Sequence, residues 1–226
     1  MYTKMNLEKP VSNLEIIKKK IAEQEAEAGQ KKGTVKLIAV SKTKPMDQIM
    51  PVIDEGQPHF GENKVQEAVS KWQDFKEENK AINLHLLGPL QSNKVKKVFG
   101  LFDYIHSLDR NSLAEKLSDE VQKKGFCPKI FIQVNTGLEQ QKAGIEPGKI
   151  DDFMKMVRNF TDLNVVGLMC IPPINDAPET HFKLLKNLAD ENGLLELSMG
   201  MSSDYMTAIR CGATYVRVGT AIFGLR

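Results

Sequence analysis

The chain has 226 residues and a net charge of +2, which gives no electrostatic reason to expect nucleic acid or an acidic membrane as a partner. Its three widely spaced cysteines favour a reducing compartment over a disulfide framework, and residues 1–30 lack the apolar run of a secretory signal. Because no stretch approaches the roughly 20 apolar residues of a membrane span, we expect a soluble cytoplasmic protein.

The predicted elements begin with an amphipathic helix over about Val11–Ala28, after which strand-like and helical segments alternate. Short apolar runs rich in β-branched and aromatic residues indicate eight strands. In chain order they are Val35–Val40, Pro58–Gly61, Ile82–Leu87, Tyr104–Leu108, Lys129–Asn135, Val165–Ile171, Leu194–Ser198 and Tyr215–Val218. Helical patterns lie between them over Pro45–Glu55, Lys64–Glu78, Asn111–Lys124, Pro147–Asn159, Pro178–Asn192, Ser203–Ile209 and Thr220–Phe223.

Two of these helices carry signals for their ends or interior. Asn111 or Ser112 is expected to cap the Asn111–Lys124 helix, and Gly125 is expected to end it. Pro51 lies inside the Pro45–Glu55 helix, where a proline removes a backbone hydrogen bond and should kink the helix. A kink there would shift the loop that precedes the helix.

The alternation of strands and helices predicts an α/β fold with a parallel sheet and right-handed crossovers. Eight such units favour a closed barrel over an open doubly wound sheet, and the length is near the lower limit for a barrel of about 250 residues. No linker rich in Pro, Gly or Ser divides the chain. We therefore predict a single domain over residues 1–226, a (β/α)8 TIM-type barrel with an extra N-terminal helix.

Lys42 is the first candidate functional residue, because it follows the first strand at the end where such barrels carry their sites. A lysine at the mouth of a buried strand loses water around its ammonium group, which favours the neutral amine that condenses with an aldehyde. The alternative is a side chain that simply extends into solvent. Lys44, two residues further on, competes for the same role.

Two late loops offer donors for a phosphate. Gly200–Ser203, which contains Met201 and Ser202, follows the seventh strand, and Gly219 and Thr220 follow the eighth. Both combine glycine with hydroxyl groups ahead of a short helical segment, a pattern typical of phosphate sites. Barrels often bind phosphate at these two loops. Each loop alone also fits ordinary turn and cap chemistry.

Other residues are weaker candidates. Arg217 lies between valines in the last strand, so an inward guanidinium would need a planar acceptor such as a pyridine nitrogen or a carboxylate. The alternative is that Arg217 forms a structural ion pair. His85 lies in an apolar run and is typical of a core histidine. Glu62 and Asp204 are candidate general bases from their positions alone. The sequence shows no metal-ligand spacing and no glycine-rich dinucleotide loop.

Six segments together resemble one family closely. They are LIAVSKTKP (Leu37–Pro45), FGENKVQ (Phe60–Gln66), HLLGPLQSNK (His85–Lys94), GLMCIP (Gly167–Pro172), SMGMS (Ser198–Ser202) and VRVGTAIFG (Val216–Gly224). They resemble the pyridoxal 5′-phosphate (PLP) homeostasis proteins, also called the YggS/PROSC family, whose fold is similar to the barrel domain of alanine racemase. The segments come in order and are spread over most of the chain, from Leu37 to Gly224. The resemblance implies PLP as the cofactor and a part in vitamin B6 homeostasis.

The resemblance also assigns roles to individual residues. It implies that Lys42 holds PLP as a Schiff base and that Arg217 faces the pyridine nitrogen. The other cofactor-binding residues implied are Ser202, Gly219 and Thr220 at the phosphate, Met201 in the same loop, Asn63 beside the ring and His85 lining the same cavity. Lys142 resembles the family's lysine after the fifth strand and is a candidate second acceptor of PLP.

The chemistry of such a site favours holding PLP over turning over a substrate. Arginine stays protonated, so it leaves the pyridine nitrogen unprotonated and the ring a weaker electron sink. In alanine racemase the second base comes from a partner chain's extra domain, and we expect no such domain after Arg226. We predict a monomer with little or no turnover that passes PLP to PLP-dependent apo-enzymes, and we assign no catalytic residue.

Two alternatives stay open. A PLP-dependent amino-acid racemase or lyase would use the same Schiff base, and it would need a second carboxylate, tyrosine or cysteine over the ring. An aldolase-type barrel would instead join Lys42 directly to a sugar phosphate. A yellow protein would favour PLP, whereas a colourless protein that phosphorylated sugars modify would favour the aldolase.

Overall fold

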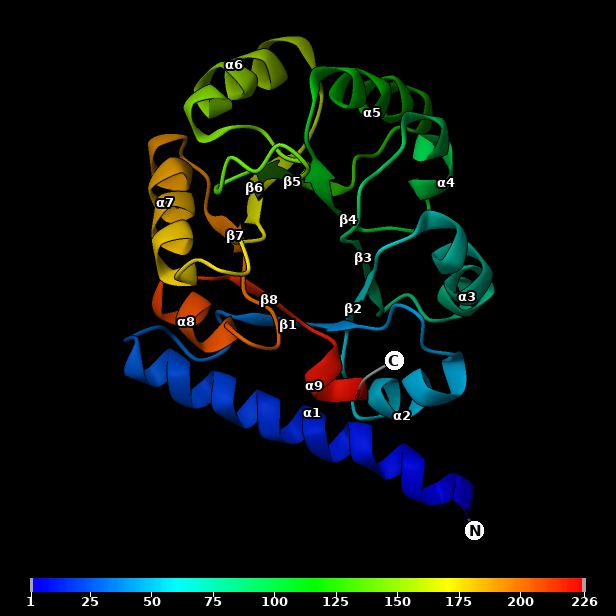
Figure 1. The fold of residues 1–226 in the computed structure, drawn as a ribbon. Coiled ribbons are helices and arrows are strands. Elements are labelled where there is room, and N and C mark those ends of the chain that lie inside the picture. The colour runs from blue at the N-terminus through cyan, green and yellow to red at the C-terminus, as the bar shows by residue number, and fades with distance from the viewer. Residues whose placement is uncertain (1, 225–226) are drawn as a thin grey trace.

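The computed structural model describes residues 2–224, and eight strands in this range form one closed barrel. The strands are β1 (Lys36–Val40), β2 (His59–Glu62), β3 (Asn83–Leu86), β4 (Tyr104–Leu108), β5 (Lys129–Val134), β6 (Val165–Cys170), β7 (Glu196–Ser198) and β8 (Tyr215–Val218). Each strand pairs in parallel with the next, and β8 pairs with β1 to close the sheet. The predicted (β/α)8 barrel is therefore confirmed (Figure 1).

Helices surround the barrel (Figure 1). They are α1 (Tyr2–Glu27), α2 (Met46–Asp54), α3 (Val65–Glu78), α4 (Val95–Val98), α5 (Asn111–Lys124), α6 (Ile150–Phe160), α7 (Pro178–Glu191), α8 (Tyr205–Arg210) and α9 (Thr220–Phe223), with 3₁₀ turns at Ser92–Lys94 and Pro147–Lys149. Apolar side chains such as Trp72 and Phe182 fill the main core. A smaller cluster comprises Ile38, Leu87, Tyr104, Phe131, Met169 and Tyr215. The two clusters exclude water from both faces of the sheet, as expected for parallel strands.

The N-terminal helix α1 lies across the outside of the barrel against α2, α8 and α9 (Figure 1). Leu14, Ile17 and Ile21 are buried, and their spacing of three and four residues places them on one face of the helix. The helix begins at Tyr2, earlier than the predicted start near Val11, and Pro10 lies within it. Neither α1 nor any other helix in residues 2–224 is long and apolar enough to cross a membrane.

Two local features differ from the predictions. The short helix α4 and the 3₁₀ turn before it were not expected, because a four-residue helix is too short to show a hydrophobic period. The N-cap of α5 is Arg110, whose backbone is extended, whereas Asn111 and Ser112 already lie inside the helix. Gly125 ends α5 with a φ of 71°, as predicted.

Helix α2 continues through Pro51 from Met46 to Asp54, so the proline does not end the helix, and the kink expected there stays a prediction. The carbonyl oxygen of Pro51 still accepts the N–H of Glu55. An interior proline lacks its own N–H bond and crowds the preceding turn, and the burial of Ile49 and Val52 offsets part of this cost by packing the helix against its neighbours.

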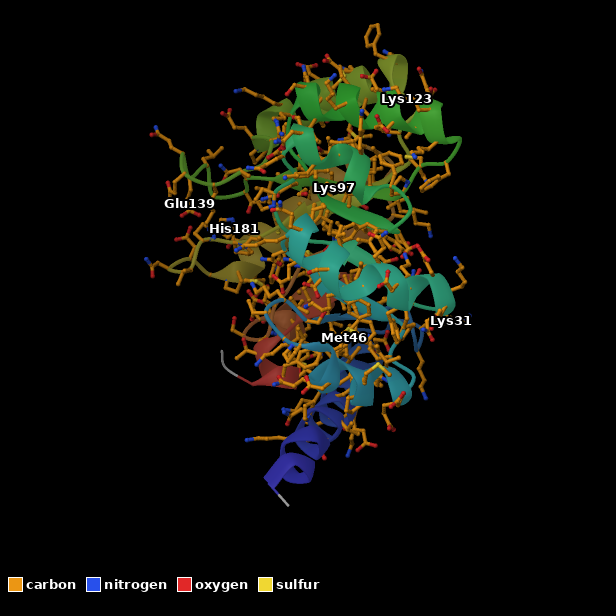
Figure 2. The ribbon with its side chains drawn as sticks, turned by 90° about the vertical axis from the view of Figure 1, so that its right-hand side faces the viewer. Lys31, Met46, Lys97, Lys123, Glu139 and His181 are labelled. Atoms are coloured by element: carbon orange, nitrogen blue, oxygen red, sulfur yellow. The ribbon has the colours of Figure 1, made fainter. Side chains whose placement is uncertain are left out.

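The loops that follow the strands lie at one end of the barrel. Figure 2 shows Glu139, from the segment after β5, and His181, near the start of α7, on the same side of the molecule. Lys31, which precedes β1, lies on the opposite side (Figure 2). Parallel strands bring all their carboxyl ends to the first side, which is where (β/α)8 barrels carry their sites.

Candidate functional site

A cavity of about 840 Å³ opens at the carboxyl ends of the strands. Its lining includes seven of the eight residues predicted to bind the cofactor, namely Lys42, Asn63, Met201, Ser202, Arg217, Gly219 and Thr220. These residues follow or end β1, β2, β7 and β8, so the closed sheet brings together segments that are far apart in the sequence. The volume lies within the range of small-molecule sites, about 300–1,000 Å³.

Lys42 lies in a tight turn directly after β1. The N–H of Lys44 donates to the carbonyl oxygen of Ser41 at 3.1 Å and closes the turn. Thr43 has a φ of 63°, in the left-handed region that β-branched residues rarely adopt. Lys44 also lines the cavity, so the structure places both candidate lysines at the same site.

Beneath this turn, Glu62 is fully buried and accepts three hydrogen bonds. Its Oε1 lies 2.7 Å from Ser41 Oγ, 2.9 Å from Lys71 Nζ and 3.0 Å from Trp72 Nε1. Glu62 does not line the cavity and is committed to these donors. Glu62 is therefore placed to support the turn that carries Lys42. It is not placed to act as the general base considered from the sequence.

The Lys71 ammonium group joins this buried pair to the turn that carries Lys42. It donates to the carbonyl oxygen of Ser41 at 2.9 Å and to Glu67 Oε1 at 3.2 Å. The same Glu67 oxygen accepts the N–H of Thr43 at 2.5 Å. The contacts hold the backbone on both sides of Lys42, which is what a strained conformation at Thr43 requires.

Asn63 reaches the cavity because the next loop has no side chain at Gly88. A Cβ atom at position 88 would lie 2.2 Å from the carbonyl oxygen of Asn63. The two loops can therefore approach this closely only with glycine at that position.

The loops after β7 and β8 meet at the same cavity. Ser202 Oγ accepts the N–H of Ala221 at 3.4 Å, which joins the two loops. The N–H of Met201 donates to Asp204 Oδ1 at 2.6 Å. Asp204, considered a base from the sequence, is absent from the cavity lining and instead holds the loop that presents Met201 and Ser202.

Arg217 points into the barrel and reaches the cavity lining. Its Nη1 donates to Ser198 Oγ at 2.8 Å, and its Nη2 donates to the carbonyl oxygen of Cys170 at 2.9 Å. Burial lowers the pKa of Arg217 from its usual value, although a guanidinium stays protonated. Among residues 2–224 it forms no ion pair, so the structural ion pair considered from the sequence is not found there.

The prediction that His85 lines the same cavity is wrong. His85 is fully buried inside the barrel, with Nε2 2.9 Å from His59 Nδ1 and Nδ1 2.9 Å from His106 Nε2. Alternate residues of a strand share a face, and Leu87, two residues further along, lines the cavity in its place. His85 therefore belongs to the layer of side chains beneath the site.

The buried histidines predict that the protein loses stability in mild acid. Desolvation by burial lowers the pKa of His59 to about 4 and lowers the pKa values of His85 and His106 well below 6.5. As the pH falls through about 6.5 the unfolded chain binds protons at these residues and the folded chain does not, so the free energy of unfolding decreases. Urea unfolding at about pH 7.5 and about pH 5.5 measures this effect before most carboxylates titrate. Equal free energies at the two pH values would contradict neutral histidines.

Lys142 lies in the loop after β5 and does not line the cavity. Its Nζ pairs with Glu139 Oε2 at 2.5 Å and donates to the carbonyl oxygen of Pro172 at 3.2 Å. A role as a second acceptor of PLP stays a prediction. In the described part of the chain no group of three or more His, Cys, Asp or Glu residues could hold a metal ion.

Comparisons with known proteins agree with the fold and the motifs. The family model described as alanine racemase, N-terminal domain, matches residues 12–226. A pyridoxal phosphate homeostasis protein from Pasteurella multocida is 40% identical in an alignment of 224 positions that covers 95% of this chain and 96% of that protein. The structure of PipY from Synechococcus elongatus with PLP bound is 38% identical with a TM-score of 0.77, over 90% of this chain and 100% of that one.

An alanine racemase from Clostridium difficile has the same fold, with a TM-score of 0.74 over 98% of this chain and 58% of the racemase chain. At 13% identity this likeness concerns the fold alone. The family model and the relatives at about 40% identity go further, because they cover nearly the whole chain. The chain therefore belongs to the alanine racemase N-terminal domain family and, within it, to the pyridoxal phosphate homeostasis proteins.

Proposed function

We propose that this protein binds PLP in the cavity at the carboxyl ends of the strands and takes part in PLP homeostasis, with little or no turnover. One observation carries the proposal. Lys42, the buried Arg217 and the two loops with glycine and hydroxyl groups line a single cavity. The PLP-bound PipY structure and the names of the relatives support the same ligand.

The donors in the cavity fit the functional groups of PLP. When bound, PLP supplies an aldehyde that can join covalently to an amine as a Schiff base. Lys42 would provide that amine, and Arg217 would donate to the pyridine nitrogen. Ser202, Gly219 and Thr220 would hold the phosphate through hydroxyl and backbone N–H groups, Met201 would contribute to the same loop, and Asn63 would lie beside the ring.

Arg217 gives a physical reason for a ligand of this kind. A buried cation without a counter-charge is costly, and a ligand that accepts its remaining N–H groups would offset part of that cost. Because the guanidinium keeps its proton, a nitrogen facing it stays an acceptor, which weakens the ring as an electron sink.

The cavity lining supports a carrier over the alternatives. Among the described residues that form it there is no Asp, Glu, Tyr, Cys or His side chain. A racemase or lyase would need such a group over the ring to move a proton, and an aldolase would need one beside its substrate. The lysines and the hydroxyl groups suffice to hold an aldehyde and a phosphate.

Titration with PLP and with pyridoxal, which lacks the phosphate, tests the proposal. We expect PLP to give a saturable visible absorption band with one equivalent per chain. Pyridoxal should bind more weakly by a factor on the order of a hundred, because the two loops would lose their charge-assisted hydrogen bonds. Equal affinities for the two compounds, or no saturable band with PLP, would contradict the proposed site.

The proposal extends to location and partners. We propose a cytoplasmic monomer that delivers PLP to PLP-dependent apo-enzymes. The three cysteines, Cys127, Cys170 and Cys211, are free thiols, as is usual in a reducing compartment. Sedimentation of the purified protein and transfer of bound PLP to an apo-enzyme would test these two points separately.

A further inference from the structure

A continuous chain of hydrogen bonds runs through the barrel interior from Arg217 toward the opposite end. Ser198 Oγ lies 2.8 Å from Arg217 Nη1 and 2.8 Å from His106 Nδ1. His106 Nε2 lies 2.9 Å from His85 Nδ1, and His85 Nε2 lies 2.9 Å from His59 Nδ1. The chain thus connects a residue of the cavity lining with His59, which is half-buried at the start of β2.

The surroundings fix the orientation of the two central rings. His85, His106 and Ser198 are fully buried. The ring of His85 stacks on Tyr104 with centroids 4.1 Å apart, and the ring of His106 stacks on Phe131 with centroids 4.3 Å apart. Each ring nitrogen of His85 and His106 therefore has one defined partner.

Arg217 determines which atom donates and which accepts in every hydrogen bond of this series. A guanidinium only donates hydrogen bonds, so Ser198 Oγ is the acceptor in this contact. The hydroxyl proton of Ser198 must then go to another atom, and within residues 2–224 the remaining partner of this oxygen is His106 Nδ1. A proton on His106 Nδ1 would leave the buried hydroxyl proton without an acceptor, which is costly.

The histidines transmit this direction because a neutral imidazole has one N–H and one acceptor nitrogen. His106 accepts at Nδ1, so it carries its proton on Nε2 and donates to His85 Nδ1. His85 then donates from Nε2 to His59 Nδ1. Burial, which disfavours the charged imidazolium, keeps His85 and His106 in the neutral form that this pattern requires.

We propose that Ser198 and His106 are positioning residues that hold Arg217 in its orientation toward the cavity. In this one-way chain every linked histidine carries its proton on Nε2. The role of Arg217 at the ligand rests on the proposed function, whereas the proton positions do not depend on it.

Nitrogen-15 NMR of the imidazole rings in the PLP-free protein tests the direction of the chain. Long-range proton–nitrogen correlations distinguish a protonated ring nitrogen from an acceptor nitrogen. At neutral pH we expect Nε2–H in His59, His85 and His106. A proton on Nδ1 of His85 or His106, or two protons on either ring, would overturn the proposal whether or not the protein binds PLP.

Ser198→Ala, with Ser107→Ala as a matched control, tests the positioning role. Both serines are fully buried in strands, but Ser107 Oγ has no hydrogen-bond partner among the described residues. We expect Ser198→Ala to weaken PLP binding about tenfold, as for one lost hydrogen bond to a charged group. Ser107→Ala should leave the affinity unchanged.

The histidine spectrum of Ser198→Ala provides a second readout that a general loss of stability would not produce. Without the hydroxyl donor, the preference of His106 for Nε2–H should be lost, whereas Ser107→Ala should keep the wild-type pattern. Equal PLP affinities and unchanged proton positions in the two variants would overturn the positioning role. If the wild-type protein failed to bind PLP, the proposed function would be refuted. The NMR result on the wild-type protein would still decide the direction of the hydrogen bonds.

Discussion

Lys42→Ala is expected to abolish covalent PLP binding, because alanine leaves no amine at the end of β1 to join the aldehyde. The phosphate loops would remain, so weak noncovalent binding should persist. The measurement is the visible absorbance of the purified variant after incubation with PLP and removal of unbound ligand by gel filtration.

Lys44→Ala is the matched control for this variant, since Lys44 lies two residues away and lines the same cavity. It should keep the visible band. If Lys42→Ala kept the band and Lys44→Ala lost it, the attachment point would be Lys44, and the turn after β1 would present the ligand differently from the proposal.

Glu62→Gln is expected to lower the free energy of unfolding by about 2 kcal/mol, because it removes the fully buried one of the two carboxylates that pair with the ammonium group of Lys71 and leaves only the more exposed Glu67. The side chain of Lys71 is only 8% exposed and that of Glu62 is not exposed at all. The new amide would also place an N–H₂ group where Glu62 Oε2 has no hydrogen-bond partner among the described residues. Since Lys71 holds the carbonyl oxygen of Ser41, the variant should also bind PLP more weakly.

Glu120→Gln is the matched control for Glu62→Gln. Glu120 is also buried, but the side chain of its partner Lys123 is 62% exposed. Lys123 lies on α5, distant from Met46, which marks the helix that follows the Lys42 turn (Figure 2). Glu120→Gln leaves no buried charge without a partner, so it should lower the free energy of unfolding by less than about 1 kcal/mol. Urea unfolding of both variants makes the comparison, and equal losses of stability would contradict a special role for the buried pair beneath Lys42.

Most of the barrel could be predicted from the sequence because its strands are covered on both faces and appear as short apolar runs. Tyr104–Leu108 and Tyr215–Val218 have the bounds predicted for them. The helix α4 was missed because one helical turn shows no period. The predicted helix started near Val11, whereas α1 begins at Tyr2 and includes Pro10.

The rim of the site could also be predicted, because parallel strands bring their carboxyl ends together in any closed barrel. The depth of each side chain inside the barrel could not be predicted, because it depends on the stagger between neighbouring strands. His85 points inward as Leu87 does, yet only Leu87 reaches the cavity. In the sequence, both residues are inward positions of the same apolar run, so the pattern does not distinguish them.

The residues that support the site were missed for a similar reason. Lys71 follows Glu67 by four residues on α3, a spacing that normally indicates an exposed pair on a helix surface. Only the packing of α3 places this lysine under the turn after β1, where it meets Glu62. Likewise, Ser198 lies in a motif segment, but its partner His106 comes from a strand on another part of the sheet.

Borohydride reduction of the PLP-loaded wild-type protein, followed by mass mapping of its peptides, tests most directly whether Lys42 holds PLP. Reduction makes the attachment permanent, so each labelled lysine can be identified. The proposed site predicts a phosphopyridoxyl group on the peptide that contains Lys42, at one per chain. Label found on Lys142 or spread over surface lysines, with Lys42 unmodified, would contradict it.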